Sequence, residues 1–396
     1  MTKNTDPVDA ANKASTNSND RLLPLLHEDR SHYRGSFNPP IYRSSTFNQS
    51  SLAQYASPEA SIPPNYIYGR VNNPTTRVFE EMMAEIEHGE DAVAFASGMG
   101  AITASLLAFL RHGAHVLVVD HVYHPVEVFF ENMTEPMALT VETFKPGADL
   151  APLIRPNTRI IYAESPTSKY FEMLDLPAIS RVARANGVIT IADNTWATPL
   201  YQQPLDLGID ISLHSVTKYI NGHSDMMGGV AITSRELMKT LRPMAINLGA
   251  TPSPEDMYLA IRGLRTLPIR MAQHMQSGLA IAHWLQAQPL VESVQHPGLP
   301  TSPHYALWQA QMSGCSSLFA VTLRAAAEGG AEAFAQGLRL FGIAPSWGGF
   351  ESLITPVSAK ANEPATFRLS IGLEPTDAII ADLAQALARY GAFVNT

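Results

Sequence analysis

The segment Ser215-Val216-Thr217-Lys218-Tyr219 holds the residue with the clearest potential for chemistry. Lys218 follows a hydroxyl-rich turn after an apolar run, where burial or a neighbouring cation would lower the pKa of its amine and make it nucleophilic. These conditions favour a lysine that forms a Schiff base, and the hydroxyl groups of Ser215 and Thr217 suit a phosphate. A surface lysine at the start of a helix fits the same segment, so support must come from elsewhere in the chain.

Asp193 gives that support, 25 residues before Lys218. It ends the apolar run 188–192, where a carboxylate is costly unless a cation pairs with it. The protonated nitrogen of a pyridine ring is such a cation, and enzymes that use pyridoxal phosphate place an acid in this role. An aspartate that caps the next turn is the alternative. We expect Asp193 and Lys218 at the ends of successive strands, where one cofactor ring would bridge them.

A second phosphate-binding element is predicted in the turn that contains Ser97, Gly98 and Met99, between a strand and a helix. Free amides at a helix N-terminus bind phosphate, and glycine allows close approach, although many strand-to-helix turns share this composition. Tyr123 follows the next strand. It could stack on an aromatic ring, but a lone aromatic residue is more often part of a core.

Two arginines suit anionic ligands. Arg70, with Tyr68, lies on an extended segment before the predicted sheet, and a guanidinium matches the geometry of phosphate. If this arm crosses a dimer interface, both residues would complete the neighbour's site. Arg368 lies in a predicted strand and suits the carboxylate of an amino acid, with backbone from 346–352 close by. An ordinary solvent-facing arginine is the alternative for Arg368.

Composition limits the classes of protein. The chain has 396 residues, and its net charge of −9 and pI near 5.8 argue against a general nucleic-acid binder. Only 16% of residues are charged, below the usual ~25%, which favours a surface covered in a homo-oligomer. The single Cys315 excludes an intrachain disulfide and favours the cytoplasm. The uncharged stretch 92–110 contains serine and glycine, so we expect a strand, turn and helix there, not a membrane span. The dispersed histidines predict no metal site.

The apolar runs predict the organisation of the chain. Short strands at 92–96, 116–119, 160–163, 188–192, 209–213 and 230–232, with helices at 99–111 and 176–185, indicate a buried, mainly parallel α/β sheet with ligands beyond its carboxyl ends. A helix at 271–288, strands at 318–323 and 367–371, and a helix at 375–390 indicate a smaller α+β domain. We divide the chain into a disordered leader (1–20) and arm together over 1–66, an α/β domain over 67–262 and an α+β domain over 263–396.

These segments, in this order, resemble the Cys/Met-metabolism family of pyridoxal phosphate enzymes over roughly residues 36–390. The segments that carry the resemblance are 39–47, 68–75, 164–166, 193–195, 217–219, 222–225, 262–266 and 368–374. The resemblance implies fold type I, the aspartate-aminotransferase-like fold, and pyridoxal 5′-phosphate as cofactor. It also implies a homotetramer built from two tight dimers.

The resemblance implies a role for each candidate residue. Lys218 carries the cofactor, Asp193 pairs with the pyridine nitrogen, and Tyr123 stacks on the ring; these three are the expected catalytic residues. Arg368 binds the substrate carboxylate with Ser346, and Trp347 and Tyr68 also contact the substrate. The phosphate is held by Ser97, Gly98, Met99, Ser215 and Thr217, with Tyr68 and Arg70 from the partner subunit.

Three positions resemble the cystathionine β-lyase branch of this family: Trp196, Ser168 and Trp347. Segments 72–75 and 251–256 instead resemble the wider family, which includes γ-acting enzymes. We therefore expect β-elimination from a sulfur-containing amino acid, with cystathionine as substrate. The alternatives are γ-lyase or γ-synthase chemistry, methionine γ-cleavage, and a broad lyase for cystine or cysteine conjugates. A catalytically silent binding protein is disfavoured because Lys218 and Asp193 are both present.

Overall fold

The apolar runs of the central region form a seven-stranded sheet in the order β1-β7-β6-β5-β4-β2-β3. Neighbouring strands from β6 to β3 run parallel, and β7 runs antiparallel to both of its neighbours. The computed structural model describes residues 33, 35–57 and 65–394, so the predicted leader over 1–20 lies outside the described residues. The strands are β1 (Asp91–Phe95), β2 (His115–Val119), β3 (Thr140–Phe144), β4 (Thr158–Glu164), β5 (Ile189–Asp193), β6 (Ile211–Ser215) and β7 (Gly229–Thr233).

Helices cover this sheet and bury its apolar side chains. One core joins the sheet to α5, α6, α7 and α9, and a second joins it to α4 and the first part of α10. Local signals set several helix ends; Asp175, for example, caps α7 by accepting from the Ala178 amide at 2.9 Å. The helices are α4 (Pro74–Ile86), α5 (Gly98–Phe109), α6 (His124–Met137), α7 (Leu176–Ala185), α8 (Thr198–Tyr201), α9 (Arg235–Leu248) and α10 (Pro254–Gln286), with a short 3₁₀ turn at Ala151–Leu153.

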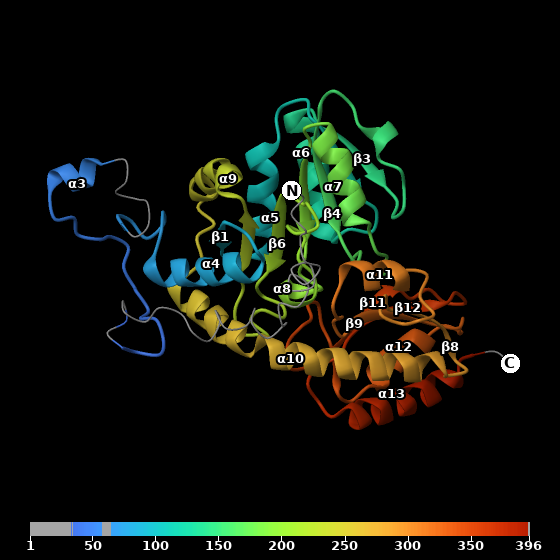
Figure 1. Cartoon of the computed structure of the whole chain (residues 1–396). Coiled ribbons are helices and arrows are strands. Elements are labelled where there is room, and N and C mark those ends of the chain that lie inside the picture. The colour runs from blue at the N-terminus through green and yellow to red at the C-terminus, as the bar shows by residue number, and fades with distance from the viewer. Residues whose placement is uncertain (1–32, 34, 58–64, 395–396) are drawn as a thin grey trace, which may run out of the picture.

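A five-stranded sheet in the order β10-β11-β12-β9-β8 follows in the C-terminal part. The long helix α10 connects the two parts and runs beside both sheets (Figure 1). Its Ile261 packs in the core of the large sheet and its Ile281 in that of the second. The remaining elements are β8 (Val291–Gln295), α11 (Tyr305–Gln311), β9 (Leu318–Leu323), α12 (Gly330–Gly337), β10 (Phe341–Ile343), β11 (Ser352–Ser358), β12 (Ala365–Ser370) and α13 (Thr376–Gly391).

The mainly parallel sheet and the smaller α+β part confirm the predicted fold class. The helix expected at 271–288 instead begins at Pro254. Pro268 normally interrupts a helix, but it is tolerated here because Leu264, Leu267 and Met271 on either side are completely buried. The predicted boundary between residues 262 and 263 lies inside this helix.

The N-terminal arm is held to the rest of the chain around Tyr42, whose amide donates to the Thr75 hydroxyl at 2.9 Å, but not around its helix α3 (Leu52–Ala56). This helix buries no residue and lies apart from the two sheets (Figure 1). Phe37 and Leu52 are 71% and 87% exposed. An isolated bridge between Thr46 and Tyr68 links the arm to the segment that leads into α4.

Among the described residues, no helix combines the length and the apolar character that crossing a membrane requires.

Candidate active site

The candidate active site is a cavity of about 290 Å³ at the carboxyl ends of the parallel strands. Parallel strands end at one edge of the sheet, so turns distant in sequence meet there. The C-terminal part contributes one wall through Leu318 and Trp347. Nine predicted residues line this cavity: Ser97, Gly98, Met99, Tyr123, Asp193, Ser215, Thr217, Lys218 and Trp347.

One end of the cavity suits an anion. Ser97 caps α5 by accepting a hydrogen bond from the Gly100 amide at 3.0 Å, and Gly98 lies beside Ser215. A Cβ on Gly98 would lie 2.9 Å from the Ser215 hydroxyl oxygen, so only glycine fits there. Thr217 adds a hydroxyl that donates to the Gly228 carbonyl at 3.2 Å. The first amides of α5 have no partner within the helix, and together with these hydroxyls they form a donor set for phosphate.

Asp193 supplies a carboxylate to the wall of the same cavity. Thr195 donates its backbone amide to Asp193 Oδ1 at 2.9 Å, and its hydroxyl donates to the same oxygen. Burial raises the pKa of Asp193, whereas Thr195, His214 and Lys218 oppose that rise. The carboxylate is therefore fixed in direction and suited to pair with a cation.

Lys218 supplies an amine to the wall of this cavity. Its Nζ is 2.7 Å from the Ser346 hydroxyl and 5.5 Å from the centre of the Trp347 ring. Burial and the charge of Arg368 lower the pKa of Lys218 to about 8, although Asp193 acts in the opposite direction. An amine with this pKa is partly neutral near physiological pH, as a nucleophile or base must be.

Tyr123 begins α6 and is 41% exposed at the cavity. Its backbone amide donates to Glu164 Oε2 at 2.7 Å. Burial and the negative charge of Asp193 raise the Tyr123 pKa. Burial and the same neighbour hold the Glu164 pKa well above its usual range.

Arg368 does not line the cavity. It interacts electrostatically with Glu164, Tyr123 and Lys218, which do line it. Burial lowers the pKa of Arg368, while Glu164 and Tyr123 act to raise it. Within the part of the chain that the structure describes, Arg368 forms no ion pair. An unpaired guanidinium on β12 is consistent with the predicted binding of a carboxylate.

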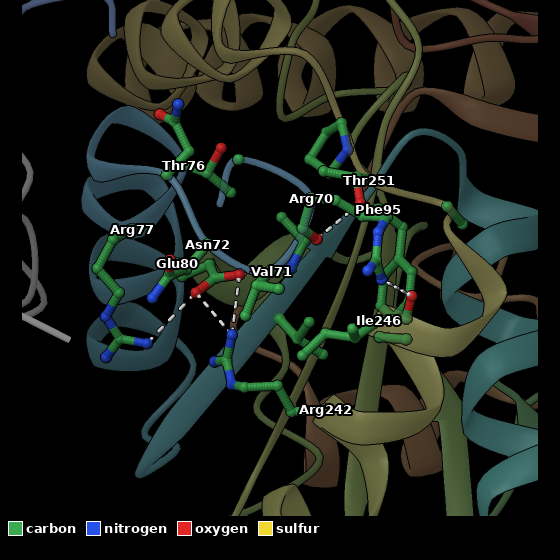
Figure 2. Close-up of a pocket in the computed structure, with 17 residues that line it drawn as sticks. Arg70, Val71, Asn72, Thr76, Arg77, Glu80, Phe95, Arg242, Ile246 and Thr251 are labelled. Carbon is green, nitrogen blue, oxygen red and sulfur yellow. Dashed lines mark hydrogen bonds and ion pairs between the residues drawn. The ribbon is translucent and has the colours of Figure 1, made fainter. Parts of the chain in front are cut away.

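Tyr68 and Arg70 are not brought to this cavity by their own chain. Arg70 donates to the Ile246 carbonyl at 3.0 Å and lines a separate, smaller pocket with Glu80 and Arg242 (Figure 2). Tyr68 is 46% exposed. A role for both residues in a neighbouring subunit's site stays a prediction.

Sequence reasoning missed several residues of the cavity wall. One feature of the sequence could have indicated the role of Glu164 beside Tyr123. Glu164 ends β4 as Asp193 ends β5, and Glu164 and Asp193 pair in register. Phe171, Met227 and Ile102 form apolar parts of the wall and gave no such signal. Phe171 is buried with a φ of +56°, a strained conformation for a bulky residue.

The donor set fits pyridoxal 5′-phosphate, the cofactor implied by the sequence. Amides and hydroxyls suit its phosphate, the fixed carboxylate of Asp193 suits its protonated ring nitrogen, and the amine of Lys218 suits its aldehyde. Among the described residues, no group of three or more histidine, cysteine, aspartate or glutamate side chains is arranged to hold a metal ion.

Comparisons with known proteins agree with this chemistry. The family model described as Cys/Met metabolism PLP-dependent enzyme matches residues 25–388. A cystathionine beta-lyase from Bordetella avium is 40% identical over 365 residues, covering 89% of this chain and 92% of its own. An L-alanine/L-glutamate racemase from Wolbachia pipientis is 36% identical, covering 90% of this chain and 94% of its own. The crystal structure of cystathionine gamma synthase from Xanthomonas oryzae pv. oryzae superposes with a TM-score of 0.87 at 32% identity, covering 96% of this chain and 100% of that one.

Proposed function

Because the chain belongs to the Cys/Met metabolism family of PLP-dependent enzymes, we propose that it is a carbon–sulfur β-lyase that converts L-cystathionine to homocysteine, pyruvate and ammonia. The cofactor of this family is pyridoxal 5′-phosphate. The observation that carries the β-lyase assignment is the pair Trp196 and Trp347 on the cavity wall, joined there by Ser168. All three resemble the β-lyase branch, and the Bordetella avium relative bears that name.

In this proposal the residues that line the cavity would hold the cofactor. Asp193 would pair with the ring nitrogen, Tyr123 would stack on the ring, and Lys218 would bind the aldehyde carbon until the substrate amine takes its place. Tyr68 and Arg70 of the partner subunit complete the phosphate site. The residues of this chain that hold the phosphate are Ser97, Gly98, Met99, Ser215 and Thr217.

The same arrangement supports β-elimination. Arg368 and Ser346 hold the substrate carboxylate, and Trp347 contacts the rest of the substrate with Tyr68 of the partner subunit. When bound, the cofactor supplies the electron sink for charge that develops at Cα. The Lys218 amine, set free when the substrate amine displaces it, would remove the proton from Cα, because its lowered pKa leaves a neutral fraction near pH 8. Breaking the Cβ–S bond releases the thiolate, and the enamine product hydrolyses to pyruvate and ammonia.

Cleavage or replacement at the γ carbon is the second candidate function. It is favoured by the close superposition on cystathionine gamma synthase from Xanthomonas oryzae and by segments 72–75 and 251–256. Both candidates use Lys218 and Asp193 in the same way, so the product must distinguish them.

We also propose a homotetramer of two dimers in the cytoplasm. Exposed apolar residues of the arm, Phe37 and Leu52, support burial against another subunit. The single, buried Cys315 is consistent with a reducing compartment. Native mass spectrometry of the cofactor-loaded protein would test the oligomer.

The deciding experiment incubates the cofactor-loaded protein with L-cystathionine and identifies the keto acid by mass spectrometry. Pyruvate with homocysteine is the expected result. 2-Oxobutyrate with cysteine would establish γ-cleavage instead. Formation of D-alanine from L-alanine, with no keto acid from cystathionine, would assign the racemase reaction named for the Wolbachia relative. The Lys218→Ala protein is the matched control for non-enzymatic products.

A further inference from the structure

A carboxylate and an imidazole lie buried next to the strand ends that carry Asp193 and Ser215. Glu87 follows the end of α4 and His214 lies in β6, directly before Ser215. Glu87 Oε1 is 3.1 Å from His214 Nε2, and both side chains are fully buried. Neither residue lines the cavity, so any effect on chemistry must pass through another group.

Strand pairing places this pair next to Asp193. β5 and β6 are neighbours in the sheet, and Asp193 is in register with Leu213, the residue before His214. Asn194, directly after Asp193, donates to Glu87 Oε1 at 3.1 Å. Ser212 in β6 also donates its hydroxyl to this oxygen. Glu87 therefore contacts both strands that carry the cofactor-binding residues.

The pair is electrically unusual for a protein core. Glu87 Oε2 and both ring nitrogens of His214 have no well-aligned hydrogen-bond partner among the described residues. A buried carboxylate is costly unless donors satisfy it, and here Asn194, Ser212 and the imidazole 3.1 Å away lie around Glu87 Oε1. Glu87 is therefore held both to β6 and to the residue that follows β5.

We propose that Glu87 and His214 are positioning residues for the cofactor: Glu87 ties Asn194 to Ser212 and His214, and these contacts hold the ends of β5 and β6 so that Asp193 faces the ring nitrogen. His214 and Lys218 oppose the effect of burial on the Asp193 pKa, and Glu164 on β4 is the neighbouring carboxyl group that acts against ionisation. The inference rests on the proposed role of Asp193, but not on the position of bond cleavage.

His214→Asn tests this proposal directly. Two quantities are measured: the dissociation constant of pyridoxal 5′-phosphate, by equilibrium dialysis, and the pH dependence of the visible absorption of the bound cofactor. We expect binding to weaken about 10-fold, the scale known for outer partners of metal ligands. The acid limb of the absorption profile should move to higher pH, because an Asp193 that is less well aligned with the ring nitrogen takes up a proton more readily.

Glu87→Gln should give the same two changes with smaller size, since the amide keeps the shape but accepts the hydrogen bonds of Asn194 and Ser212 less strongly. The double variant should be no worse than His214→Asn, because both residues act through one set of contacts. Additive losses would overturn the proposal. If His214→Asn does not fold, Glu87→Gln decides alone, and unchanged cofactor affinity and pH profile would overturn it.

The chain offers a control in a second histidine–glutamate pair, of which only the histidine is fully buried. His115 Nε2 at the start of β2 lies 3.3 Å from Glu142 Oε2, at the amino ends of the parallel strands, whereas Asp193 lies at a carboxyl end. His115→Asn should leave cofactor affinity and the pH profile unchanged. Equal changes in this variant would mean a general effect of core damage and would refute the proposal. Detection of 2-oxobutyrate from cystathionine would refute the β-lyase assignment but not the positioning role of Glu87 and His214.

Discussion

The charged side chains around β1 and those at the ends of β5 and β6 are paired in different ways. Around β1, Arg77 and Arg242 alternate with Glu80 and Asp91. Arg77 Nη1 lies 2.7 Å from Asp91 Oδ1, and Arg242 Nη1 lies 3.2 Å from Glu80 Oε2. Figure 2 shows Glu80 held between the two guanidinium groups. Burial raises the pKa of Asp91, but Arg242 and Arg77 outweigh that effect and lower it.

In the candidate site, opposite charges lie near one another without pairing. Among the described residues, Lys218, Arg368, Asp193 and Glu164 form no ion pair. Burial therefore dominates, and it lowers the pKa of Lys218 to about 8 and raises that of Asp193. The side chains around β1 pair with one another and stabilise the fold; we call them the β1 cluster (Arg77, Glu80, Asp91 and Arg242). The charged side chains of the candidate site are instead left for a ligand to pair with. Variants of the two clusters should therefore separate stability from activity.

Replacement of Lys218 should give the largest effect on activity. Lys218→Ala removes the amine that takes the α-proton, so turnover should fall by at least about 10⁴-fold, the upper range for a general base. The free energy of unfolding should change little because the amine has only one hydrogen bond, to Ser346. Keto-acid formation and denaturant unfolding measure the two quantities. Lys239→Ala, at an exposed position, is the control, and near-normal turnover of the Lys218 variant would remove Lys218 from the mechanism.

Disruption of the β1 cluster should lower stability and leave activity unchanged, the reverse of the Lys218 variant. Glu80→Gln leaves two largely buried guanidinium groups with Asp91 as the one carboxylate that they share, which should lower the free energy of unfolding by about 3–5 kcal/mol. Turnover per folded molecule should stay normal. Glu81→Gln breaks only the exposed partner of Arg77 and should cost at most about 1 kcal/mol. A stable Glu80 variant with low turnover would contradict the separation of the two clusters.

Arg368→Ala should weaken substrate binding more than it slows chemistry. A hydrogen bond to a charged group contributes about 1.5–3 kcal/mol, so KM should rise by roughly 10- to 150-fold. Arg324→Ala, an exposed position just after β9 in the same sheet, should leave KM unchanged. Steady-state kinetics with cystathionine separates KM from kcat. An unchanged KM for the Arg368 variant would place the substrate carboxylate elsewhere.

The features that the sequence predicted best were those that follow from strand order. Asp193 ends β5, and Lys218 comes shortly after β6, because parallel strands bring successive loops to one edge. The start of α10 and the location of Arg70 depend on contacts between distant segments. Packing of Leu264 and Met271 carries the helix through Pro268, and no local pattern indicates that Arg70 reaches the Ile246 carbonyl.

The contacts that other side chains make to the residues of the cavity could not be predicted from the sequence either. Thr195 stands two residues after Asp193, a spacing typical of an ordinary turn, yet its hydroxyl also accepts from the Ser215 amide at 2.8 Å. Glu87 is separated from His214 by 127 residues, so only the folded chain makes their pairing visible. Chemistry-bearing residue types can be read from a sequence, whereas the contacts that set their pKa values require the fold.

The smallest expected effect is a shift in the titration of Lys218. In the cofactor-free protein, the rate of acetylation by acetic anhydride should rise with pH and reach half its maximum near pH 8, followed by peptide mass spectrometry. Arg368→Ala should move this midpoint to higher pH, because loss of a nearby cation makes the protonated amine less costly. Arg324→Ala should leave it in place. A midpoint near 10.4, as for an ordinary lysine, would mean that the amine is solvated. Lys218 would then not be a buried, unpaired charge that differs from the paired charges of the β1 cluster.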